Sequence, residues 1–303
     1  RVMGAGAGVA LAHGTGQSPT EVPKFRVATT RTALSVQQAH FLGFVPSMGL
    51  SYALPRLKGS VGLYLALTGA RINAADALYC GAATHFIPSD RKDRCLKHLA
   101  SQHDDFPISQ IKAVLDDFAS SPSGHHKDYK TFRHPPTYYE RYTAPSFTDP
   151  THLEEQSEAI ERCFGAPHSV AEMMEALKAE ETPWGKATLA AVESMSPTSL
   201  HFTFELIRRG KTSSVEDCFR VEWRVARRLL YERGDFFEAV RALEVDRDGK
   251  PKWEPGPATK EEISELFRPL GEETPLDLSL DHIKGRGSRG APLSAAAAAA
   301  AAG

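Results

Sequence analysis

Leu63-Tyr64-Leu65-Ala66-Leu67-Thr68-Gly69-Ala70-Arg71 is the stretch of sequence that decides the fold. It is a compact apolar segment, and Gly69 ends it as expected for a buried helix. Asn73 then predicts the N-cap of a second helix, and Gly81 ends that helix as its C′ residue. Thr84-His85-Phe86-Ile87 follows as a short buried strand. Helix, helix and strand in close succession indicate an α/β architecture.

The flanking sequence extends this pattern in both directions. Upstream, residues 25–30 contain a β-branched run that predicts a strand. Downstream, Pro88-Ser89-Asp90 starts a helix, and residues 107–118 carry apolar side chains at helical spacing. Beyond a linker rich in Ser, His, Pro and Tyr, further helices are predicted over about 152–164, 168–180, 184–195, 197–209 and 214–233, with a short one near 260–267.

Four regions follow from this reading. They are an α/β core over 1–120, a linker over 121–150, a helical region over 151–270 and a low-complexity tail over 271–303.

Composition excludes several classes of protein. The chain of 303 residues has 36 Lys and Arg against 38 Asp and Glu, so its net charge does not indicate a nucleic-acid binder. No apolar stretch approaches the roughly 20 residues of a membrane span. The four cysteines lie far apart without a C-x-x-C motif, which favours reduced thiols over a disulfide scaffold or a zinc module. His125, His126 and His134 lack regular ligand spacing, so no metal and no cofactor are expected.

Nine short strings, in order along the chain, resemble one known family. They run from near the start of the chain to Trp253: Val2-Met3-Gly4-Ala5-Gly6-Ala7-Gly8, Phe25-Arg26-Val27-Ala28-Thr29, Ser51-Tyr52-Ala53-Leu54-Pro55-Arg56-Leu57, the deciding stretch itself, Ala74-Ala75-Asp76-Ala77-Leu78-Tyr79, Ala83-Thr84-His85-Phe86, Met195-Ser196-Pro197-Thr198-Ser199-Leu200, Gly234-Asp235-Phe236 and Lys250-Pro251-Lys252-Trp253. The ordered set resembles the 3-hydroxyisobutyryl-CoA hydrolase branch of the enoyl-CoA hydratase (crotonase) superfamily.

The resemblance implies the C-terminal part of a crotonase-type α/β spiral followed by a mainly α-helical region, and hydrolysis of a small 3-hydroxyacyl-CoA thioester. The chain starts well over a third of the way into the family. The preceding part would hold the first oxyanion-hole loop and most coenzyme A contacts. In the resembled fold Gly6 supplies the second oxyanion N–H. A dinucleotide loop at Gly4, Gly6 and Gly8 is disfavoured, because no strand precedes it and the fingerprint is incomplete.

The carboxylates of the resembled hydrolase motif are missing from their expected positions. The Glu position falls on Ala39 and the Asp position on Ser47, and Glu21 is the only carboxylate in the first 75 residues. His40 as a general base and Ser47 as a nucleophile are weak substitutes. Losing a positioned acid or base typically costs about 10²–10⁴ in rate. The sequence therefore predicts that the chain on its own is not an enzyme.

Three functional interpretations remain open. The first is a non-catalytic, hydrolase-like subunit of the mitochondrial small ribosomal subunit, contacting other mitochondrial ribosomal proteins and at most peripheral rRNA. The alternative is a 3-hydroxyisobutyryl-CoA hydrolase completed by a missing N-terminal segment or a second chain. The third is a free-standing acyl-CoA-binding or regulatory pseudoenzyme. A mitochondrial location without membrane or metal partners accompanies the first interpretation.

Two further groups of residues bear on these interpretations. Arg220, Arg224, Arg227 and Arg228 lie near one helical face and are able to meet phosphates, although a solvated face paired with Glu216 and Glu222 is the simpler interpretation. No stacking platform of aromatic side chains accompanies them. Asp235 and Glu238 are the carboxylates next suspected near a remnant pocket, with capping of a helix start as the favoured role.

Overall fold

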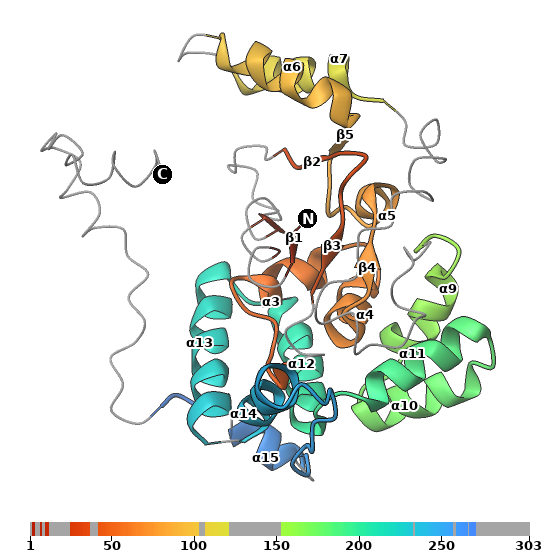
Figure 1. The fold of residues 1–303 in the computed structure, drawn as a ribbon, viewed down its shortest axis with the longest axis vertical. Helices are drawn as coiled ribbons and strands as arrows, with labels where there is room; N and C mark the ends of the chain where they lie inside the picture. Colours follow the sequence, from red (N-terminus) through yellow and green to blue (C-terminus); the bar gives the residue numbers. More distant parts are fainter. Residues whose placement is uncertain are drawn as a thin grey trace, which may run out of the picture. The chain divides into compact units, whose positions relative to one another are not determined.

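The computed structural model describes residues 2–3, 7, 10–11, 25–36, 42–102, 107–120, 153–232, 234–256, 259–265 and 267–270. The predicted linker over 121–150 and the tail over 271–303 lie outside these residues. The expected fold class is confirmed, since short strands and their helices are followed by a larger helical part (Figure 1).

The N-terminal part alternates short strands and helices. Its elements are β1 (Val2–Met3), β2 (Val27–Ala28), β3 (Leu34–Ser35), α3 (Leu50–Ala53), the 3₁₀ turn η1 (Leu54–Arg56), α4 (Val61–Thr68), β4 (Arg71–Ile72), α5 (Ala74–Tyr79), β5 (His85–Phe86), α6 (Ser89–Ala100) and α7 (Ile108–Phe118).

Helices are the only regular secondary structure among the described residues of the C-terminal part. Its elements are α9 (Ser157–Ile160), the π-helical turn η5 (Glu161–Gly165), α10 (Val170–Ala179), α11 (Pro183–Glu193), α12 (Pro197–Gly210), α13 (Val215–Tyr231), α14 (Asp235–Val240), the π-helical turn η6 (Arg241–Val245) and α15 (Lys260–Glu265).

The strands form two small sheets. In the first, β3 lies between β1 and β4, pairing parallel with β1 and antiparallel with β4, with Leu34 opposite both Val2 and Ile72. In the second, β2 pairs parallel with β5, with Val27 opposite His85. β1, β3 and β4 have no counterpart among the elements predicted from sequence, because no β-branched run like that of residues 25–30 marks them. β1 directly precedes Gly4, so the expectation that no strand precedes the glycine-rich turn is wrong.

Helix α4 lies at the centre of the main core. All eight of its residues are buried, as expected for a helix that is apolar on every side. It packs against η1, α9, α11 and α12. A Cβ on Gly62 would collide with the carbonyl oxygen of Leu54, so glycine permits the close approach of α4 to η1. Gly69 ends the helix with φ +63°, which confirms the predicted stop.

Local capping signals account for several of the predicted helix starts. Asn73 accepts a hydrogen bond from the N–H of Asp76, and Ser196 accepts one from the N–H of Ser199. Asp76 is itself buried and accepts from the N–H of Leu153, which ties α5 to the start of the helical part. Among the described residues, no helix is both long enough and apolar enough to cross a membrane.

Candidate functional site

The loop from Gly43 to Gly49 leads into α3 and contains Ser47, one of the two positions where the sequence expects a carboxylate. Gly43, Met48 and Gly49 all have positive φ, at +54°, +63° and +83°. Such a conformation is costly for a residue with a side chain, so Met48 is held there by its surroundings. Val45 is fully buried in a second apolar cluster between α12 and α13 and anchors the loop.

Glu222 of α13 supports this loop from inside the protein. Its side chain is almost fully buried. One carboxylate oxygen accepts from the N–H of Gly49 at 2.8 Å, and the other accepts from the N–H of Ser51 at 2.8 Å and from Ser51 Oγ at 2.6 Å. Gly49 offers no side-chain cap to α3, so Glu222 takes the place of an N-cap residue.

Burial raises the pKa of the Glu222 carboxyl above its ordinary value, because removal from water penalises the charged form. The hydrogen bonds from Ser51 and from the loop amides act in the opposite direction and offset part of that effect. The sequence paired Glu222 with arginines on a solvated face, and that interpretation is wrong. Cys218, Val225 and Leu229 are buried on the same side of α13, and Glu222 lies four residues after Cys218 and three before Val225, a helical spacing that could have placed it inside.

Asp235, the first of the two suspected carboxylates, lies directly behind Gly43. A Cβ built on Gly43 would lie 2.9 Å from the Asp235 carbonyl oxygen. The buried Asp235 carboxylate accepts from Ser196 Oγ at 2.5 Å and from the N–H of Glu254 at 2.8 Å. It therefore joins the starts of α12 and α14 and backs the loop, in keeping with the favoured structural role.

Glu238, the second suspected carboxylate, is held by groups of its own neighbourhood. It makes a two-pronged ion pair with Arg241, at 2.7 and 2.9 Å, and accepts from the N–H of Lys252 at 2.7 Å. These donors lower the pKa of the Glu238 carboxyl to about 2. Arg241 also pairs with Asp246 and Asp248, so Glu238 belongs to a network that closes η6.

Several predicted site residues cannot be compared with the structure. Gly6, Ala39, His40 and the histidines at 125, 126 and 134 lie outside the described residues. Ser47 is described and is half-buried in the loop. Within the described ranges no group of three or more His, Cys, Asp and Glu side chains is placed to hold a metal ion. The four cysteines are buried and none is paired.

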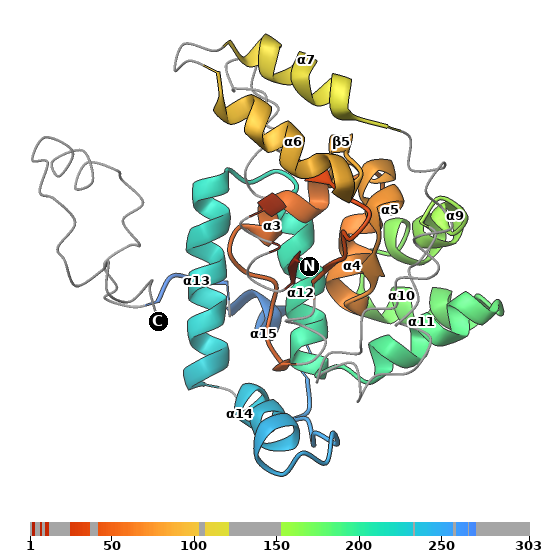
Figure 2. The same cartoon turned by 45° about the horizontal axis from the view of Figure 1, so that its top comes forward.

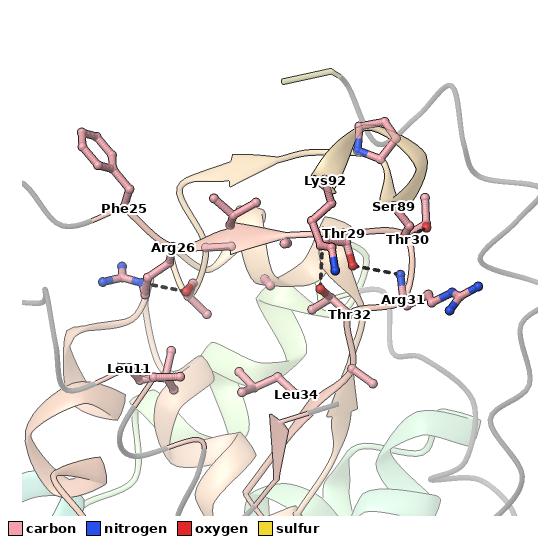
Figure 3. Close-up of a pocket in the computed structure, with 18 of the residues that line it drawn as sticks. Leu11, Phe25, Arg26, Thr29, Thr30, Arg31, Thr32, Leu34, Ser89 and Lys92 are labelled. Atoms are coloured by element: carbon pink, nitrogen blue, oxygen red, sulfur yellow. Dashed lines mark hydrogen bonds between the residues drawn. The ribbon is translucent and has the colours of Figure 1, made fainter. Parts of the chain in front are cut away.

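A pocket of about 1100 Å³ lies beside the turn between β2 and β3, a feature that sequence reasoning missed (Figure 3). Its wall combines small apolar side chains with Arg26, Lys92 and the hydroxyls of the turn. Arg26 donates to the carbonyls of Gly81 and Ala82, both at 2.8 Å.

The hydroxyls of this pocket are also engaged within the protein. Thr30 and Ser89 bond each other at 2.6 Å, and Thr32 Oγ1 accepts from the N–H of Thr29 at 2.8 Å. Lys92 pairs with Asp93 at 3.2 Å. These hydroxyls and Lys92 have partners within the protein, whereas Arg26 Nη1 is buried without a hydrogen-bond partner.

Comparison with known proteins gives a match over nearly the whole described chain. The family model described as enoyl-CoA hydratase/isomerase matches residues 1–267. A zebrafish (Danio rerio) protein named 3-hydroxyisobutyryl-CoA hydrolase, mitochondrial, is 34% identical over 265 residues, which is 88% of this chain and 60% of the zebrafish protein. The human protein of the same name is 31% identical over 89% of this chain and 61% of its own length. The chain thus spans about three fifths of these relatives.

Solved structures give the same fold. A carnitinyl-CoA dehydratase from Mycobacterium thermoresistibile superimposes with a TM-score of 0.67 at 29% identity, covering 90% of this chain and 66% of that one. An enoyl-CoA hydratase from Rhodobacter sphaeroides gives a TM-score of 0.64 at 25% identity, covering 89% of this chain and 66% of that one.

These relatives correct one expectation drawn from the sequence. The absence of carboxylates at Ala39 and Ser47 predicted that the chain is not an enzyme, and this prediction is wrong. The proteins that match most of this chain at 31–34% identity carry the names of enzymes. The reasoning failed because it inferred the fate of a whole reaction from two positions, while 88–89% of the chain matches proteins that are named as hydrolases.

Proposed function

Since the chain belongs to the enoyl-CoA hydratase/isomerase family, we propose that it takes part in the hydrolysis of a 3-hydroxyacyl-CoA thioester such as 3-hydroxyisobutyryl-CoA. Water adds to the thioester carbonyl, the carbon–sulfur bond breaks, and the products are the free hydroxy acid and the thiol of coenzyme A. The observation that carries this proposal is the identity of 34% to a named hydrolase over 88% of the chain.

The structure holds the Gly43–Gly49 loop of the candidate site in a defined conformation. Glu222 accepts a hydrogen bond from the Gly49 end of the loop, and the backbone of Asp235 lies against Gly43 at its other end, while the Asp235 carboxylate is bonded to Ser196 and Glu254. A loop held in this way can keep its backbone N–H groups in fixed directions, and preorganised donors are the larger part of catalysis in acyl transfer. In this proposal Glu222 and Asp235 are positioning residues, and Ser47 is the polar side chain that the loop carries.

The test is release of the coenzyme A thiol from 3-hydroxyisobutyryl-CoA by the full chain, followed with a thiol reagent and compared with acetyl-CoA. Gly49→Ala places a Cβ at φ +83° within the loop, whereas Gly81→Ala does so at φ +80° outside it. We expect turnover by the wild type, a large loss in Gly49→Ala and near-normal kcat/KM in Gly81→Ala. Absence of turnover by a folded wild-type chain, or equal loss in both variants, contradicts the proposal.

Assembly with the mitochondrial small ribosomal subunit is a second candidate function. The specific observation in its favour is the outer side of α13, where Arg227 is exposed and Arg220 and Arg224 are half-buried. The names of the zebrafish and human relatives support a mitochondrial location for this chain as well. Sedimentation of the endogenous protein from mitochondrial extract, with and without EDTA, tests both points. Co-migration with the small subunit in moderate salt supports assembly, and migration as a small free particle contradicts it.

A further inference from the structure

The small sheet of β2 and β5 has one covered edge and one open edge. On the β5 side, the N–H of Ser120 donates to the carbonyl of Phe86 at 3.0 Å. Ser120 follows α7, and the pair α6 and α7 lies next to β5 (Figure 1, Figure 2). The chain itself therefore occupies the outer edge of β5, which leaves β2 as the edge at which another strand can pair.

The backbone of Val27 in β2 points away from β5. The carbonyl of Arg26 accepts from the N–H of His85 at 3.2 Å, and the carbonyl of Ala28 accepts from the N–H of Ile87 at 2.9 Å. Since the backbone groups of successive residues in a strand point to opposite sides, the N–H and C=O of Val27 lie on the open edge. No described residue supplies a hydrogen bond to either group. The Val27 side chain is 41% exposed, whereas that of Ala28 is buried.

The cavity of about 1100 Å³ lies along this open edge. Its wall includes every residue from Phe25 to Leu34, and so both faces of β2, but it includes neither residue of β5. A cavity that touches both faces of a strand and not its neighbouring strand lies at the edge of that strand. Leu11 and Leu34 close the side opposite to Arg26 and Thr29 (Figure 3). The space beside the open edge is therefore partly apolar.

The unbonded polar groups along this cavity are of the kind that another strand satisfies. The N–H and C=O of an edge residue such as Val27 pair with the C=O and N–H of an added strand, which is a recurring way of binding extended peptides. Arg26 adds a further donor, because its Nη1 is buried without a partner. Thr30, Ser89 and Lys92 already have partners within the protein, so they favour a charged small molecule less than a strand.

The relatives supply a polypeptide for this edge. The chain covers 60% of the zebrafish hydrolase, which leaves 40% of that protein without a counterpart here. A sheet of only two strands is marginal by itself, and three or more strands are usual. We propose that the open edge of β2 binds an extended β-strand from the part of the hydrolase polypeptide that this chain does not span. The inference goes beyond the proposed hydrolysis and does not depend on it.

The experiment adds to the full chain a separate, fluorescently labelled polypeptide, the part of the zebrafish protein that precedes its aligned 265 residues. Binding is measured by anisotropy, and hydrogen exchange locates the amides that become protected. We expect binding together with slower exchange of the Val27 N–H. The N–H of Ile87, which is already bonded to Ala28, should exchange at an unchanged rate.

Substitutions at Val27 separate the open edge from other surfaces. Val27→Pro removes only a donor that points away from β5, and it should weaken binding by about tenfold or more. Val27→Lys places a charge on the edge and should weaken binding similarly, and it decides the test if Val27→Pro does not fold. Val27→Thr keeps the N–H and should retain most of the affinity. Val245→Lys, the matched control, alters a valine that is 70% exposed elsewhere and should bind as the wild type does.

Three results overturn the proposal. The first is a wild-type chain that does not bind the zebrafish polypeptide, or a Val27→Lys variant that binds it as tightly as Val245→Lys. The second is binding that leaves the Val27 N–H unprotected, which would place the polypeptide on another surface. The third is a dimer of the chain alone that Val27→Lys abolishes, which would assign the edge to a second copy. Thioester turnover is not measured, so failure of the proposed hydrolysis is distinguishable from each of these results.

Discussion

Glu222 and Ser51 are joined by two hydrogen bonds, from the N–H and the Oγ of Ser51, across 171 positions of sequence. The pair joins the middle of α13 to the start of α3 and, through the N–H of Gly49, fixes the end of the loop that carries Ser47. One buried carboxylate thus connects the helical C-terminal part to the α/β core at the candidate site. This arrangement makes the shape of the loop depend on α13.

Glu222→Ala is expected to destabilise the protein by about 3–5 kcal/mol, because it leaves three buried donors without their acceptor. The measurement is the urea midpoint at neutral pH, with an unchanged slope as the sign of a pure stability effect. Glu232→Gln on the exposed end of the same helix is the control, expected within about 0.5 kcal/mol of wild type. Equal midpoints for Glu222→Ala and the control would show that the bonds contribute little.

The raised pKa of Glu222 also predicts a dependence of stability on pH. When the folded pKa exceeds the unfolded value of about 4.3, the unfolded chain releases this proton first as pH rises. The contribution of Glu222 is therefore greatest below that value and is lost as pH rises through the folded pKa. Subtracting the unfolding free energy of Glu222→Gln from that of wild type isolates this term, which should fall as pH rises above about 4.3. A difference that rises with pH would contradict the assignment.

Glu238 predicts the opposite dependence. Its pKa is lowered to about 2, so the stability that it contributes is present above the unfolded value of about 4.3 and is lost as pH falls toward 2. Glu238→Gln should therefore unfold at a higher pH in an acid titration than wild type. Glu155→Gln, which removes an exposed carboxylate in a turn, should not shift the transition. An acid midpoint that is the same for both variants would show that the network around Arg241 does not act in acid unfolding.

Local signals made part of this fold predictable and left part of it hidden. The starts of α5 and α12 follow from Asn73 and Ser196, whose caps need only three residues of context. The two-residue strands β3 and β4 lack such a signal, since their pairing is decided by partners elsewhere in the chain.

The residues of the candidate site likewise include some that the sequence could predict and some that it could not. Ser47 could be located by resemblance. The burial of Glu222 depends on α3, 171 residues away. Because Arg220 and Arg224 flank Glu222 in the sequence, the sequence placed Glu222 on a solvated face.

Gly62→Ala tests the close approach of α4 to η1. The added Cβ would collide with the backbone carbonyl of Leu54, which cannot move away as a flexible side chain can. We expect a loss of about 1–3 kcal/mol in unfolding free energy from overpacking. Gly81→Ala meets no atom within 4 Å but has φ +80°, so it should cost only about 1–2 kcal/mol of backbone strain. Gly62→Ala should also loosen the core around α4, seen as faster amide exchange there, and Gly81→Ala should not. Equal exchange in both variants would argue against the packing explanation.

Ala39→Glu/Ser47→Asp tests whether carboxylates at these two positions increase the rate of thioester hydrolysis by this chain. The resemblance described in the sequence analysis implies carboxylates at these two positions. A positioned acid or base contributes typically about 10²–10⁴ to the rate, so the double variant should raise kcat/KM for 3-hydroxyisobutyryl-CoA by about that factor. Each single variant should give less, because groups that act as a unit are not additive. Ala100→Glu/Ser101→Asp, at exposed positions at the end of α6 and just after it, makes the same two substitutions elsewhere and controls for added carboxylate in general. A double variant that folds and binds substrate without any gain in turnover would show that the wild-type chain positions its thioester by a different set of residues.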